Sequence, residues 1–85
     1  MLTVSVISPE AVLFEGTTES VVAPAFDGQV GILTGHAPMV TLLGKGVLRL
    51  GAEGAGAHRF NVEGGFVQVV DDIVRVVTEQ ATKSA

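Results

Sequence analysis

Apolar and polar residues alternate along most of the chain, in short segments bounded by glycine, proline or acidic residues. In the first segment, Leu2 to Ile7, the side chains of Leu2, Val4 and Val6 fall on one face of an extended chain. A period of two with many β-branched residues is typical of a β-strand. The same reasoning predicts further strands at Ala11 to Phe14, Thr17 to Ala23, Gln29 to Leu33, Met39 to Leu43, Val47 to Leu50, Ala57 to Glu63, Phe66 to Val70 and Ile73 to Val77.

The spacing of these segments predicts an all-β fold. Glycine or proline interrupts every window long enough for an amphipathic helix except the last, Thr78 to Ala85, which begins a helix or frays. Many short strands separated by turns are typical of a β-sandwich or a flattened barrel. A chain of 85 residues forms one domain. We place this domain at residues 1–78, followed by a polar C-terminal tail at residues 79–85.

The composition indicates a protein partner. The chain is 47% hydrophobic and 16% charged, which favours a folded core over disorder. So small a domain buries a limited share of its surface, so this composition leaves apolar area exposed. The net charge is −4, and the five lysines and arginines are scattered along the chain. We therefore expect no nucleic-acid binding.

Neither cysteine chemistry nor a membrane-spanning segment is expected. The chain has no cysteine, which excludes disulfides and thiolate metal sites. No apolar run approaches the length of a membrane span. The N-terminus lacks the positive segment and apolar block of a signal peptide. We expect an intracellular, soluble protein.

No group of residues has the pattern of an active site. The serines lack the context of a nucleophile elbow, and His36 and His58 do not form a metal-binding motif. Asp71 and Asp72 are adjacent, which is typical of a solvated turn. The glycine-rich residues from Gly44 to Gly56 match neither a dinucleotide-binding nor a phosphate-binding loop. We expect no enzyme activity and no cofactor or metal site.

The least generic stretch runs from Phe26 to Leu43. It is too apolar for an ordinary solvated loop and too rich in glycine for an ordinary strand. Glycines as close as Gly28, Gly31 and Gly35 indicate backbone at positive φ, or backbone that another group approaches closely. Taken alone, His36 is a turn residue whose ring bonds a nearby carbonyl; the alternative is the polar tip of a contact loop.

The run Gly28-x-x-Gly31-Ile32-Leu33-x-Gly35-His36-Ala37-Pro38 resembles the N-terminal domain of the ε subunit of F-type ATP synthase, called δ in mitochondria. Further segments resemble that family in the same order: Val6 to Glu10 with Leu13 to Gly16, Val21 to Pro24, Gly46 to Arg49, Gly64 to Val69, and Val74 to Val77. Each motif is weak alone, but the ordered set is specific and covers nearly the whole chain.

The resemblance implies a fold of two packed five-stranded β-sheets. It also implies a non-catalytic subunit of the rotating central stalk, because catalysis in this family belongs to the β subunits. Such a subunit binds the γ subunit and the membrane-embedded ring of c subunits, and couples proton or sodium flow to ATP synthesis. The chain would lie at the cytoplasmic face of the cell membrane, attached to it through the complex.

The resemblance further implies which residues make contacts. In the family, the loop matching Asp27 to Pro38 lies toward the c ring, and one face of the sandwich packs on γ. The expected residues of the contact loop, at one end of the sandwich, are Gly28, Gln29, Val30, Gly31, His36, Ala37 and Pro38. The expected apolar residues facing γ are Met39, Val40 and Leu42, in a segment that is partly core and partly interface.

The chain departs from its relatives in two residues and in length. Gln29 stands where many relatives carry an acidic residue, which removes a surface ion pair that contributes about 0–1 kcal/mol. Thr34 stands where relatives often have proline. Without proline the unfolded chain has more conformational freedom, which lowers stability by up to about 1 kcal/mol. Many relatives continue into two helices that inhibit ATP hydrolysis and in some members bind ATP. Because the sequence stops at Ala85, as a short form or a truncated chain, we expect neither an inhibitory arm nor an ATP site.

Two other functions compete with the rotor subunit. A stand-alone β-sandwich module that holds a ligand in its loops is suggested by the glycine-rich loops and the acidic charge. A small hydrolase would need a catalytic group, for which only His36 is available. The coupling ion, H⁺ or Na⁺, is left open because its ligands lie on other subunits.

Overall fold

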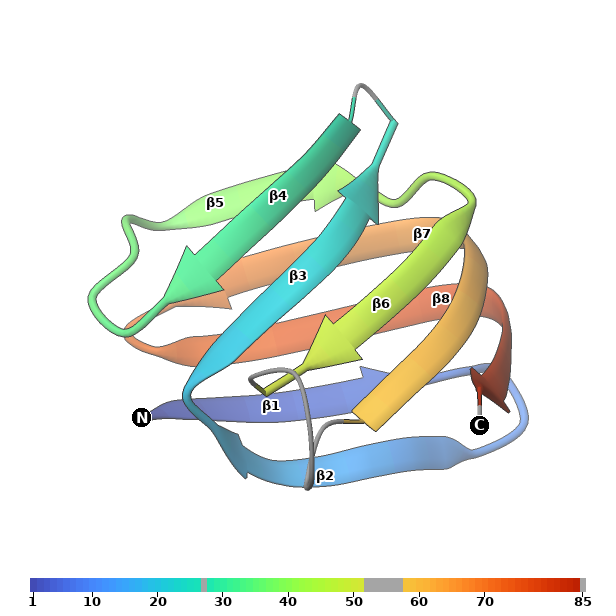
Figure 1. Ribbon diagram of the computed structural model, residues 1–85, viewed down its shortest axis with the longest axis horizontal. Coiled ribbons are helices and arrows are strands. Elements are labelled where there is room, and N and C mark those ends of the chain that lie inside the picture. Colours follow the sequence, from blue (N-terminus) through green and yellow to red (C-terminus); the bar gives the residue numbers. More distant parts are fainter. Residues whose placement is uncertain (27, 52–57, 85) are drawn as a thin grey trace.

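The computed structural model describes residues 1–26, 28–51 and 58–84, and among these residues it contains strands and no helix (Figure 1). Its eight strands are β1 (Leu2–Ile7), β2 (Val12–Thr18), β3 (Ser20–Ala25), β4 (Gly28–Leu33), β5 (Met39–Leu42), β6 (Gly46–Leu50), β7 (His58–Val70) and β8 (Ile73–Ser84). The expected all-β fold is confirmed.

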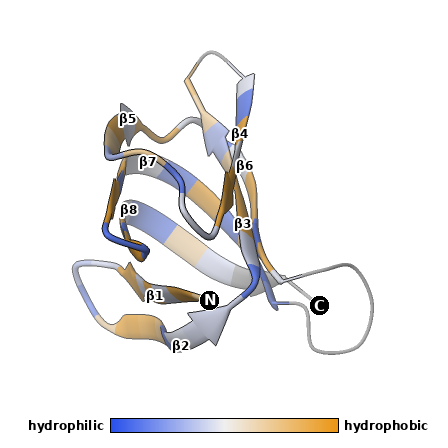
Figure 2. Ribbon diagram, turned by 90° about the vertical axis from the view of Figure 1, so that its left-hand side faces the viewer, coloured by the Kyte–Doolittle hydropathy of each residue, from blue (hydrophilic) through white to orange (hydrophobic). Residues whose placement is uncertain are grey.

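The strands form two packed layers because β7 and β8 each take part in both. Layer 1 has the order β2-β1-β8-β7-β5 and uses residues 65–70 of β7 and 73–78 of β8. Layer 2 has the order β8-β7-β6-β3-β4 and uses residues 58–63 of β7 and 80–84 of β8. Figure 2 shows layer 1 on the left and layer 2 on the right. The arrangement matches the expected pair of five-stranded sheets.

Two glycines allow the long strands to bend between the layers. Gly64 and Gly65 have φ values of 75° and 103°, a region that residues with a side chain rarely adopt. A Cβ atom on Gly65 would overlap the carbonyl oxygen of Val77 and lie 2.8 Å from the Cα atom of Thr78. The close pairing of β7 with β8 at the bend therefore requires glycine at position 65.

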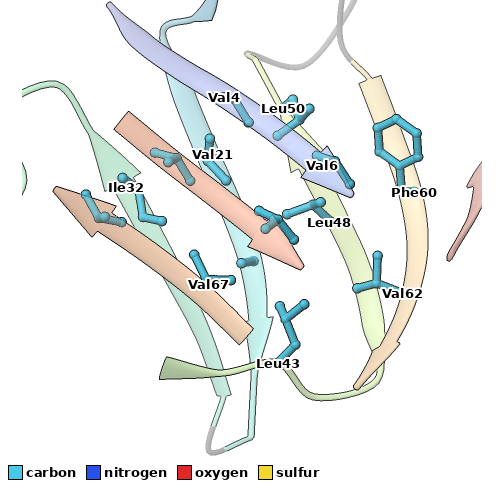
Figure 3. Packing of buried hydrophobic residues seen from close by; sticks show 14 of the residues in the cluster. Val4, Val6, Val21, Ile32, Leu43, Leu48, Leu50, Phe60, Val62 and Val67 are labelled. Carbon is cyan, nitrogen blue, oxygen red and sulfur yellow. The ribbon is translucent and has the colours of Figure 1, made fainter. Parts of the chain in front are cut away.

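A single apolar core lies between the layers (Figure 3). It consists of aliphatic side chains and one phenylalanine, all at most 6% exposed: Leu2, Val4, Val6, Val21, Ala23, Ile32, Leu43, Leu48, Leu50, Phe60, Val62, Val67, Val69, Val74 and Val76. The rings of Phe14 in layer 1 and His58 in layer 2 are in contact, 4.9 Å apart between centroids and tilted by 56°. Burial of this alternating set is the main stabilising term of the fold.

Backbone hydrogen bonds also join the layers along one side. The Leu43 N–H donates to the Gly65 carbonyl at 2.9 Å, and the Gly44 N–H donates to the Pro24 carbonyl at 2.7 Å. The Phe26 N–H donates to the Leu42 carbonyl at 3.2 Å. The end of β5 thus connects layer 1 to the β3–β4 hairpin, which gives the sandwich the character of a flattened barrel.

Two local expectations are wrong, and a third lies partly outside the described residues. Glu15 and Gly16, which separate two of the expected strands, lie inside β2, where Gly16 pairs with Val4. The two strands expected on either side of Gly64-Gly65 are one strand, β7, because the glycines bend the chain without ending it. The first residue of the expected segment Ala57 to Glu63 lies outside the described residues.

The C-terminal segment also differs from the expectation. Residues 79–84, expected as a polar tail that begins a helix or frays, continue β8 as far as Ser84. They pair with residues 59–63 of β7 in the same antiparallel register as the first half of the strand. This pairing is non-local, so the polar composition of the segment did not reveal it.

Candidate protein-interaction site

The expected contact loop is a strand followed by a short turn. Gly28, Gln29, Val30 and Gly31 belong to β4, which pairs with β3 and forms an edge of layer 2. The strand expected at residues 29–33 is therefore confirmed, whereas the loop expected from Gly28 to Pro38 is limited to residues 34–38. Asp27 lies outside the described residues.

The two faces of β4 differ. Val30 packs against the core and Ile32 is fully buried, while Gln29, Gly31 and Leu33 are exposed. A Cβ atom on Gly31 would meet nothing within 4 Å. Gly31 is therefore not required by packing within this chain, and its outer side is open to a partner.

The turn from Thr34 to Pro38 is held by three hydrogen bonds. The His36 N–H donates to the Leu33 carbonyl at 3.1 Å, and His36 Nδ1 lies 2.7 Å from the Ala37 carbonyl oxygen. The Gly35 N–H donates to the Asp72 carboxylate at 2.6 Å. His36 is half-buried, while Ala37 and Pro38 are exposed. The ring of His36 thus bonds a neighbouring carbonyl, and its role in contacting a partner stays a prediction.

Asp72 has a structural role beyond the turn that the sequence predicts. Asp71 and Asp72 form the expected turn between β7 and β8, with φ values of 51° and 61°, as in a type I′ turn. The backbone carbonyl of Asp72 also accepts a hydrogen bond from the Thr3 N–H at 2.9 Å. Asp72 therefore ties the β4–β5 turn to one end of layer 1, where Figure 1 shows these segments together.

The three apolar residues expected to face γ do not share a face. Successive strand residues point to opposite sides, and Met39 packs against the core. Val40 is 67% exposed and Leu42 is 62% exposed. Met39 is half-buried and lies on the core side of β5, so Val40 and Leu42 provide the exposed apolar surface of this strand, and contact with γ stays a prediction.

Leu42 belongs to an apolar row that crosses all five strands of layer 1. The strand registers place Leu42 beside Phe66, Phe66 beside Val77, Val77 beside Ile7, and Ile7 beside Val12. Val40, Val70 and Ile73 lie on the same side of the layer. We call this surface the outer face of layer 1, comprising the outward residues of β2, β1, β5 and the layer 1 halves of β7 and β8.

The outer face of layer 2 is largely polar in the part formed by β6, β7 and β8. Its outward residues there are Val47, Arg49, Arg59, Asn61, Glu63, Gln80 and Thr82. A depression of about 320 Å³ lies on this face, lined in part by Lys45, Asn61, Glu63 and Gln80. Such mixed polar residues are typical of a solvated surface.

The described residues offer no metal centre and no membrane-crossing helix. No three histidine, aspartate or glutamate side chains among them are grouped to hold a metal ion. Within the same residues, no helix has the length and apolar character needed to cross a membrane.

Comparison with known proteins assigns the chain to a family. Residues 1–84 match the model of "ATP synthase, Delta/Epsilon chain, beta-sandwich domain". The ATP synthase epsilon chain of Leptospira borgpetersenii is 46% identical over 78 residues, which cover 92% of this chain and 61% of that protein. The epsilon chain of Rhodopirellula baltica is 45% identical over 89% of this chain and 59% of its own length. The chain thus spans about 60% of the length of these relatives.

Solved structures share the fold at low sequence identity. A chain of the Euglena gracilis mitochondrial ATP synthase, solved as an OSCP/F1/c-ring assembly, has a TM-score of 0.86 at 23% identity, covering 96% of this chain and 52% of its own. A chain from the central stalk and c-ring of the Tetrahymena thermophila enzyme has a TM-score of 0.76 at 18% identity, covering 95% and 65%. From the family model and the curated relatives, we conclude that the chain belongs to the ATP synthase delta/epsilon family and matches its β-sandwich domain.

Proposed function

We propose that the protein is a non-catalytic subunit of the ATP synthase rotor, which binds the γ subunit and the c ring and couples ion flow to ATP synthesis. The observation that carries the proposal is the match of residues 1–84 to the family model. The structural relatives from c-ring and central-stalk assemblies support it through their fold. As part of this complex, the protein would lie at the cytoplasmic face of the membrane.

The γ subunit covers the outer face of layer 1 in this proposal. That face presents Val40 and Leu42 together with Phe66, Ile73 and Val77. An apolar surface that crosses a whole sheet is typical of a protein interface, because its burial removes apolar area from water. The polar side chains on β6–β8 of layer 2 offer no comparable surface.

The c ring contacts the turn that follows β4. The expected contact residues His36, Ala37 and Pro38 lie at the end of the sandwich where β4 ends and β5 begins. Gln29 and Gly31 lie on the outer side of β4, which leads into this turn. Gly28 and Val30 contribute to the same strand, with Val30 supporting it from the core.

Single substitutions at the exposed Leu42 and the half-buried His36 distinguish the two contacts. Leu42→Glu places a charge in the apolar row, and we expect it to weaken binding of purified γ by about 10- to 100-fold. His36→Glu leaves γ binding unchanged but lowers proton-driven ATP synthesis in the reconstituted enzyme. The control is Val47→Glu, which adds the same charge to an exposed valine on the outer face of layer 2.

Calorimetry with γ and ATP synthesis in vesicles are the measurements. The proposal is wrong if Leu42→Glu binds γ as tightly as the unmodified chain does, or if Val47→Glu weakens binding equally. The assignment of the turn is wrong if His36→Glu leaves both assembly and ATP synthesis unchanged.

A further inference from the structure

Arg75 is a cation near the centre of the outer face of layer 1, beside its apolar row. It lies on β8, the central strand of layer 1, and pairs in register with Gln68 on one side and Ser5 on the other. Along β8 its outward neighbours are Ile73, which is 55% exposed, and Val77. Arg75 itself is exposed.

The outward residues that neighbour Arg75 on this face are uncharged. Arg75 lies next to the row that joins Leu42, Phe66, Val77, Ile7 and Val12. Among the outward residues that the structure describes on β1, β5 and the layer 1 halves of β7 and β8, Arg75 is the only charged one. A partner that covers the apolar row therefore also covers Arg75.

Covering Arg75 without supplying an acceptor would oppose binding. A charged group that loses its water must be paired, because an unpaired buried charge is strongly destabilising. The neutral neighbours Gln68 and Ser5 carry no compensating charge. The guanidinium presents a planar fork of N–H donors that matches a carboxylate with two parallel hydrogen bonds.

Two carboxylates of this chain, Glu15 and Asp71, lie at the margins of the same face. Glu15 belongs to the edge strand β2, in register with Ser5. Asp71 belongs to the turn after β7 and shares with Arg75 the lining of a depression of about 210 Å³. Neither lies in the central strands of the face, so the centre of the interface needs an acceptor from the partner.

We propose that the partner covering the outer face of layer 1 presents an aspartate or glutamate to Arg75, and that this pair sets the orientation in which the partner binds. The inference rests on the proposed function, in which the partner is γ. Apolar contacts provide most of the burial, while a single charge pair at the centre selects one docking position over others.

The test uses the 85-residue chain and purified γ in calorimetry. Arg75→Gln weakens binding by about 10- to 100-fold, and Arg75→Glu by more, because the partner's carboxylate then meets a neutral or a like-charged group. Arg75→Lys keeps the charge but loses the fork, and weakens binding by about tenfold. The affinity of Arg75→Gln depends less on salt than that of the unmodified chain.

Matched controls separate this pair from other effects. Arg59→Glu makes the same charge reversal on an exposed arginine of the outer face of layer 2, and its affinity for γ stays within about threefold. Glu15→Gln and Asp71→Asn also stay within about threefold, because the acceptor belongs to the partner. The melting temperature of each variant alone changes by at most about 3 °C, since all four side chains are exposed.

Charge reversal on the partner completes the test. One Asp or Glu to Lys substitution in a panel of γ variants restores binding to Arg75→Glu while weakening binding to the unmodified chain. The proposal is overturned if Arg75→Glu binds γ normally, if no γ variant restores binding, or if Glu15→Gln or Asp71→Asn reproduces the loss. Failure of the proposed function would give a different result. In that case the unmodified chain would not bind γ, or Leu42→Glu would bind γ as tightly as the unmodified chain does.

Discussion

The outer faces of the two layers are built partly from the same two strands, and yet they carry different side chains. In layer 2, β7 points Arg59, Asn61 and Glu63 outward. After the bend, in layer 1, the same strand points Phe66 and Val70 outward, on either side of Gln68. One continuous strand thus supplies a solvated surface at one end and a surface suited to a partner at the other.

The side of β7 that faces the core changes at Gly64-Gly65, and this change accounts for the difference. Before the pair, the buried residues of β7 are Phe60 and Val62, at even positions; after it they are Val67 and Val69, at odd positions. Alternation within each half remains regular, because a strand has a period of two. At Gly64-Gly65 the strand therefore passes from one layer to the other and also changes the side that faces the core.

The largest effect is expected from a substitution at the bend that joins the two layers. Gly65→Ala places a Cβ atom against the Val77 carbonyl at a φ of 103°, and we expect it to lower the free energy of unfolding by about 3 kcal/mol or more. Urea denaturation measures this loss. Gly31→Ala is the control, because its Cβ atom meets nothing within 4 Å and its effect stays within about 0.5 kcal/mol. Equal losses in both variants would contradict the role assigned to the bend.

A smaller effect is expected in the association of the free chain. Without its partner, the outer face of layer 1 is open, and we expect weak self-association at high concentration. Ile73→Lys reduces this association by about tenfold, whereas Val47→Lys, with the same added charge on the other face, does not. Analytical ultracentrifugation over a concentration series checks this. A similar reduction by both variants would show that net charge, and not the apolar face, controls association.

The smallest effect is expected at the end of the sandwich, where the two layers meet the β4–β5 turn. Asp72→Gly keeps the positive φ of the turn but removes the acceptor of the Gly35 N–H, and we expect a loss of about 1 kcal/mol. Asp71→Gly, at the neighbouring positive-φ position, is the matched control. Hydrogen exchange at the Gly35 amide reports on the bond directly. If both variants leave that exchange unchanged, Asp72 does not hold the turn.

Most of the strands were predictable from the sequence because their pattern is local. The alternation in Leu2 to Ile7 and the adjacent aspartates after Val70 identify β1 and the β7–β8 turn without knowledge of the fold. Residues 79–84 were not recognised as a strand, because their pairing with residues 59–63 lies far along the chain. For the candidate site, the sequence did not show that Val40 and Leu42 are exposed while Met39 packs against the core, because the sidedness of β5 depends on the opposite layer.

The all-β class, the approximate strand positions and the glycines where the chain turns can be recognised in the sequence, because these features depend on residues that are neighbours along the chain. Which side of each strand faces outward is set by packing between the layers. In β8, Ile73 and Val77 are apolar on one side, and Val74 and Val76 are apolar on the other. Alternation alone cannot choose between two apolar sides; the choice is made by the opposite layer, which buries Val74 and Val76 and leaves Ile73, Arg75 and Val77 outside.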